Sequence, residues 1–90
     1  MIEEKLLIAT NILKNAGCKE IFLFGSQAKG NATEFSDIDL GVKGLPLHSF
    51  FSIHFDLETA LNMKVDLVDF DYQKDFFLLL QKHGELKKIG

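Results

Sequence analysis

The stretch FGSQAKGNATEFSDIDLGV, residues 24–42, decides the fold of this chain. The apolar run EIFLF at residues 20–24 leads into it and predicts a buried strand. Gly25 and Ser26 then begin a turn, and Ser26 is expected to cap a short helix that runs through Lys29. Residues 30–36 have loop character. Residues 37–42 alternate polar and apolar side chains, which predicts a second strand.

The residues on either side extend this pattern with helices and one more strand. Residues 2–16 carry an apolar stripe at helical spacing and end at Gly17, a residue suited to a left-handed stop. A further helix is expected from Pro46 to about Asn62, because proline suits the first turn of a helix.

The C-terminal third adds a strand and a helix. KVDLVDF, residues 64–70, predicts a third strand, and Gln73–His83 predicts a final helix that stops at Gly84. The order α-β-(short α)-β-α-β-α predicts an α/β or α+β fold with a small mixed sheet of about three to four strands flanked by helices.

Composition limits the possible functions. Ninety residues predict a single domain, 1–90, and 47% hydrophobic residues predict a globular one. The net charge is −3 and all ten basic residues are lysines, which argues against direct nucleic-acid binding. Cys18 is the lone cysteine, so no internal disulfide or multi-cysteine zinc site is expected. Since no apolar run reaches membrane-spanning length, we expect a soluble, cytoplasmic protein.

Three aspartates interrupt the predicted strands and are candidate metal ligands. Asp37 and Asp39 are two residues apart, so on a strand they share one face. Two carboxylates so close repel each other unless they are protonated or bind a cation, and Mg²⁺ takes carboxylate oxygens. Asp66 joins them if the second and third strands are neighbours. Three carboxylates can hold two metal ions roughly 3.5–4 Å apart, an arrangement that catalyses displacement at phosphorus.

The turn at Gly25 is a candidate nucleotide site. A glycine after a buried strand lets the backbone approach a ligand, and the start of the next helix offers free N–H groups to a phosphate. Ser26 adds a hydroxyl donor, and Lys29 can neutralise phosphate charge.

Each of these features also has an ordinary structural explanation. Gly25-Ser26 alone is typical of a capped turn, a single Asp-x-Asp of a solvated sheet face, and Asp66 of an edge-strand charge that discourages aggregation. The functional interpretation therefore depends on all of them occurring together. The stretch is not a Walker loop, because Asn31 follows the second glycine. It is not a calcium hand either, because the twelfth loop position falls on His48.

GSQAKGNATEFSDIDLGV resembles the Gly-Ser-x(10)-Asp-x-Asp signature of the nucleotidyltransferase superfamily related to DNA polymerase beta, and VDLVD resembles the strand with its third carboxylate. The short chain resembles the minimal nucleotidyltransferases, many of which are antitoxins of helical HEPN ribonuclease toxins. The resemblance implies that Gly25 and Ser26 bind the nucleotide phosphates. It also implies that Asp37 and Asp39 hold both metals.

The same resemblance implies that Asp66 holds the second metal and helps to activate the acceptor hydroxyl. Members often have arginine where Gln27 and Lys29 stand, and Lys29 keeps that charge. The implied reaction is AMP transfer from ATP to a tyrosine of the toxin, with Mg²⁺ as cofactor.

Two apolar runs bear on partners. FFLLL at 76–80 and LHSFFSIHF at 47–55 are either a well-covered core or an exposed patch that binds another subunit. A helical partner is the first expectation and a homo-oligomer the second. Two other functions stay open: an idle site in a module that neutralises a toxin by contact alone, and transfer to a small molecule such as an antibiotic.

Overall fold

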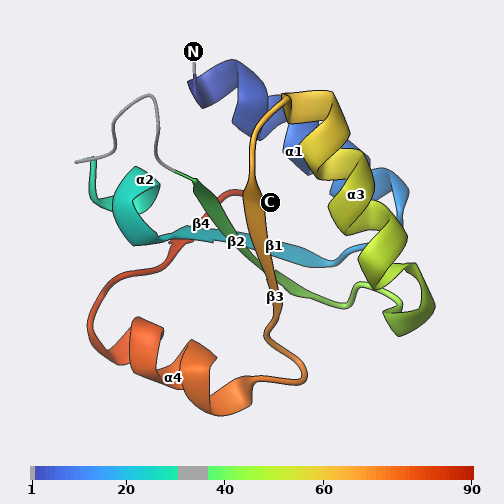
Figure 1. The fold of residues 1–90 in the computed structure, drawn as a ribbon. Coiled ribbons are helices and arrows are strands. Elements are labelled where there is room, and N and C mark those ends of the chain that lie inside the picture. Colours follow the sequence, from blue (N-terminus) through green and yellow to red (C-terminus); the bar gives the residue numbers. More distant parts are fainter. Residues whose placement is uncertain (1, 31–36) are drawn as a thin grey trace.

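A four-stranded sheet forms the centre of the protein (Figure 1). The computed structural model describes residues 2–30 and 37–90. The strands lie in the order β3-β2-β1-β4, where β1 pairs antiparallel with β2 and β4, and β2 pairs parallel with β3. This mixed sheet confirms the predicted fold class. The strands are β1 Glu20–Phe24, β2 Ile38–Lys43, β3 Val65–Asp69 and β4 Lys87–Lys88.

Helices cover both faces of the sheet. Figure 1 shows α1 and α3 side by side on one face and α4 on the other. Among the described residues, none of the helices has the length and apolar character needed to cross a bilayer. The helices are α1 Ile2–Asn15, α2 Gly25–Lys29, α3 Phe50–Leu61 and α4 Lys74–Lys82, and a short 3-10 turn, η1 Leu47–Ser49, precedes α3.

Each face of the sheet has its own apolar core. The larger core packs α1 and α3 against the side chains of β2 that alternate with Asp39, namely Ile38, Leu40 and Val42. The second core, under α4, is rich in phenylalanine and is built from Phe22, Phe24, Phe70 and Leu80. Because side chains alternate along a strand, Asp39 lies on the face that α4 covers in part.

Three details differ from the predictions. Ser26 does not cap α2: the helix begins at Gly25, and the residue before it is extended and makes no side-chain cap. Gly25 has φ +74°, a conformation that lets the backbone turn sharply from strand to helix. No side chain caps this turn. Pro46 does not begin a helix, because its ψ of 130° is extended and the turn η1 separates it from α3. The strand β4 was not predicted individually, and most of the predicted loop, residues 31–36, lies outside the described part of the chain.

Candidate active site

Asp39 and Asp66 lie side by side on neighbouring strands. They are register partners in the parallel pairing of β2 with β3, so their side chains leave the same face of the sheet. The two carboxyl groups share a hydrogen bond. The sequence analysis made the site depend on this adjacency, and the structure brings the two residues together.

The surroundings of Asp39 favour its protonated form. Partial burial, the hydrogen bond to Asp66 and the negative charges of Asp66 and Asp37 raise the pKa of Asp39 from 3.8 to about 6. Burial is the largest of these causes. A carboxyl group whose pKa is raised by a neighbouring carboxylate marks a place where negative charge accumulates.

Gly25 is in direct contact with the Asp39 carboxyl group. A Cβ atom built on Gly25 would lie 2.1 Å from Oδ2 of Asp39, which leaves no room for any side chain. Its φ of +74° also disfavours every residue other than glycine. The turn into α2 therefore meets the sheet at Asp39.

Asp37 lies just before β2 and interacts only in part with the pair formed by Asp39 and Asp66. Its charge helps to raise the pKa of Asp39, but its Oδ2 atom lies 3.8 Å from Nζ of Lys64. Within residues 2–30 and 37–90, no three His, Cys, Asp or Glu side chains are already spaced as metal ligands.

The donor chemistry of the site nevertheless fits a divalent cation. Two carboxylates this close repel each other, and either a proton or a cation between them relieves the repulsion; below a pH of about 6 the proton on Asp39 does so. Carboxylate oxygens are the protein ligands that Mg²⁺ takes most readily. Asp39 and Asp66 can exchange the shared proton for a cation, with Asp37 next to them.

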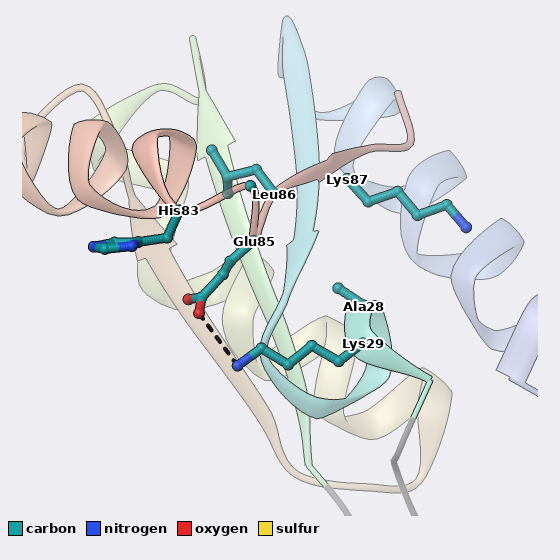
Figure 2. Close-up of a pocket in the computed structure, with 7 residues that line it drawn as sticks. Ala28, Lys29, His83, Glu85, Leu86 and Lys87 are labelled. Carbon is teal, nitrogen blue, oxygen red and sulfur yellow. Dashed lines mark ion pairs between the residues drawn. The ribbon is translucent and has the colours of Figure 1, made fainter.

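Lys29 extends from the end of α2 toward the segment that follows α4. Its Nζ atom lies 3.2 Å from Oε1 of Glu85, the ion pair that Figure 2 marks with a dashed line. The two residues border an open hollow of about 270 Å³, between α2 and the chain that leads into β4. Ser26 is half-buried in the first turn of α2. The one predicted phosphate-binding cation is thus already paired with a carboxylate.

Neither ion-pair partner at the site was predicted. Lys64 reaches Asp37 because the strand register that pairs Ile38 with Val65 sets the two preceding residues next to each other, and no local pattern in the sequence gives that register. Glu85 reaches Lys29 only through the path of the chain after α4.

The comparisons with known proteins identify the class of this chain. Residues 8–86 match the family model described as "Polymerase beta, Nucleotidyltransferase", so the chain belongs to this family of nucleotidyltransferases. A relative from Methanocaldococcus jannaschii, named "Putative protein adenylyltransferase MJ1215", is 41% identical over 58 residues, which span 61% of this chain and 67% of that protein.

Solved structures narrow the class to the minimal nucleotidyltransferases. A chain from a toxin–antitoxin complex with AMP-PNP matches with a TM-score of 0.73 and 28% identity, over 98% of this chain and 72% of that one. A chain from the complex of tri-AMPylated Shewanella oneidensis HEPN toxin with MNT antitoxin matches with a TM-score of 0.71 and 25% identity, over 98% and 71% respectively. This chain is therefore a polymerase beta-like minimal nucleotidyltransferase with the fold of the MNT antitoxins.

Proposed function

We propose that this protein is a magnesium-dependent nucleotidyltransferase that transfers AMP from ATP to a tyrosine hydroxyl of a HEPN-type toxin. The observation that carries the proposal is the pairing of Asp39 with Asp66 on neighbouring strands, with Asp39 against the backbone of Gly25. In this family's fold, that arrangement supports metal binding by the carboxylate pair, next to a turn that a nucleotide could approach closely.

Each predicted residue has a role in this scheme. Asp37, Asp39 and Asp66 would hold Mg²⁺, two ions in the full complex, and Gly25 and Ser26 would bind the phosphates. Bound Mg²⁺ would offset the charge of the phosphates and polarise the reacting phosphoryl group. Lys29 would leave Glu85 to neutralise the phosphate tail.

The proposed reaction also needs a residue that takes the proton of the acceptor hydroxyl. The acceptor hydroxyl oxygen forms a bond to the α-phosphorus of ATP, and the bond from that phosphorus to the pyrophosphate oxygen breaks. Asp66 takes the hydroxyl proton, and pyrophosphate leaves with the electron pair of the broken bond. The reaction also requires an acceptor hydroxyl that is aligned with the α-phosphorus. This chain would supply the metal ligands, the phosphate contacts and the base.

An exposed apolar surface supports a protein acceptor. Leu47, Phe51 and Tyr72 are 74–82% exposed and border an apolar hollow of about 480 Å³. Phe50 and Leu67 also line it. Large apolar side chains gathered around a hollow mark a surface that binds another protein, and we assign it to the helical toxin. Self-association through the same surface is the alternative that sedimentation of the isolated protein would reveal.

The test is transfer of label from ATP to the toxin. The purified chain is incubated with labelled ATP, Mg²⁺ and the helical toxin, and the labelled residue is identified by mass spectrometry. We expect wild type to label a tyrosine and Asp39→Asn to lose the activity, whereas Asp56→Asn, which removes an exposed carboxylate from α3, keeps it. Equal labelling by wild type and Asp39→Asn would reject the proposal.

One observation favours a second function, neutralisation by contact alone. Lys29 is engaged by Glu85, and the exposed apolar surface requires no chemistry to bind a toxin. In that case the variants Asp37→Asn and Asp39→Asn protect cells from the toxin as well as wild type does. Loss of protection by both variants, with binding to the toxin retained, decides for catalysis.

A further inference from the structure

Two side chains of α3 bind the backbone of the residue that precedes Asp66. The N–H of Val65 donates to Oε2 of Glu58 at 2.9 Å, and Nε2 of His54 donates to the carbonyl oxygen of Val65. His54 and Glu58 are one helical turn apart, with Nε2 and Oε2 separated by 3.8 Å. Together they occupy both outward-facing polar groups of Val65.

This contact lies where the sheet gives the least support. β3 is an edge strand, which pairs only with β2 in the sheet of the described residues. On an edge strand, every second residue directs its N–H and C=O away from the sheet, where water or another chain can take them. At Val65, α3 fills these positions in place of a further strand.

The hydrogen bond from His54 affects the orientation of Asp66, because a single peptide bond joins Val65 to Asp66. The carbonyl that accepts from His54 belongs to the same planar peptide group as the N–H of Asp66. Fixing that plane restricts the direction in which the Asp66 side chain leaves the strand. Asp66 must keep that direction to stay at hydrogen-bond distance from Asp39.

We propose that Glu58 and His54 are positioning residues, which hold the edge of the sheet so that Asp66 faces Asp39 at the spacing a divalent cation needs. This inference rests on the proposed function of Asp66 as a metal ligand. Both side chains contact the backbone of Val65, and neither is a proposed ligand of the cation or the nucleotide. Partners that orient a metal ligand typically change metal affinity by roughly 10–100-fold when they are removed.

The test compares three variants in α3. Glu58→Ala removes the acceptor, Glu58→Gln keeps an oxygen that can accept from Val65, and Asp56→Ala removes the same charge from an exposed position on the same helix. Mn²⁺ binding is measured by calorimetry, and exchange of the Val65 amide hydrogen by NMR. We expect Glu58→Ala to bind Mn²⁺ about tenfold more weakly and to exchange faster at Val65. Glu58→Gln and Asp56→Ala should stay within about twofold of wild type for Mn²⁺ binding.

The outcomes separate this inference from the proposed function. If wild type binds no Mn²⁺, both are wrong. If wild type binds and Glu58→Ala binds equally well despite faster exchange at Val65, the positioning role alone is wrong. A Glu58→Gln variant as weak as Glu58→Ala would show that charge matters rather than the hydrogen bond, and would also overturn it. Should Glu58→Ala fail to fold, His54→Phe removes the other contact and gives the same comparison.

Discussion

Replacing Asp39 by asparagine should stabilise the cation-free protein near neutral pH, although the change removes a proposed metal ligand. The folded protein holds the Asp39 proton more tightly than the unfolded chain does, since folding raises the pKa of Asp39 from 3.8 to about 6. The stability contributed by this group is therefore complete below about pH 3.8 and is lost as the pH rises through about 6. An asparagine amide can still donate to Asp66, and it never ionises.

The size of the effect follows from the pKa shift. A rise from 3.8 to about 6 corresponds to roughly 3 kcal/mol at ~1.36 kcal/mol per pKa unit. Asp39 is only partly buried, and solvent screening reduces this figure to about 1–2 kcal/mol. In a domain of 60–100 residues, about 1 kcal/mol shifts the melting temperature by roughly 4–8 °C. The expected gain is about 4–16 °C near pH 7.5.

Thermal unfolding followed by circular dichroism in EDTA measures this gain directly. Wild type, Asp39→Asn and the control Asp56→Asn are melted at about pH 4 and about pH 7.5. The gain of Asp39→Asn should nearly vanish at the lower pH, and added Mg²⁺ should reduce it at the higher pH by stabilising wild type alone. An Asp39→Asn variant that melts below wild type at pH 7.5, or shows the same difference at both pH values, refutes the reasoning.

Three further predictions follow from contacts at the site and the surface. Gly25→Ala should weaken nucleotide and Mn²⁺ binding at least tenfold in calorimetry. The reason is that the alanine methyl group would meet Asp39 and that the backbone at position 25 has a positive φ. Unchanged binding would contradict this contact. Glu85→Gln should tighten ATP binding by up to about fivefold, because loss of the ion pair frees Lys29 and an exposed ion pair is worth at most ~1 kcal/mol. Weaker binding would mean that Glu85 assists nucleotide binding. Phe51→Lys should abolish co-purification with the toxin. It should change the free energy of unfolding by no more than ~0.5 kcal/mol, because the Phe51 side chain is 81% exposed. Retained binding would show that the toxin binds another surface.

Local sequence patterns were sufficient for most of the fold. The continuous apolar run before Gly25 predicted β1, which is buried along almost its whole length, and the alternation around Asp39 predicted β2. β4 escaped individual prediction because it is two residues long and both are exposed lysines, Lys87 and Lys88. Its pairing with β1 comes from the path of the chain and leaves no hydrophobic pattern.

The site was predictable only as a set of candidates. The residues were chosen by type and spacing, whereas the contact of Asp39 with Asp66 depends on the register between two strands that are far apart in sequence. The same limit applies to α3: no local pattern shows that His54 and Glu58 bind Val65, because that contact requires the packing of a helix against a sheet edge. Long-range contacts of polar side chains are decided by tertiary structure.

A crystal grown with Mn²⁺ and a non-hydrolysable ATP analogue would show where the cation binds. Anomalous scattering locates manganese independently of the protein coordinates. We expect anomalous peaks between the carboxylates of Asp37, Asp39 and Asp66, next to the nucleotide phosphates and the backbone of Gly25. A bound nucleotide with no peak at these carboxylates, or with manganese held elsewhere, would contradict this expectation.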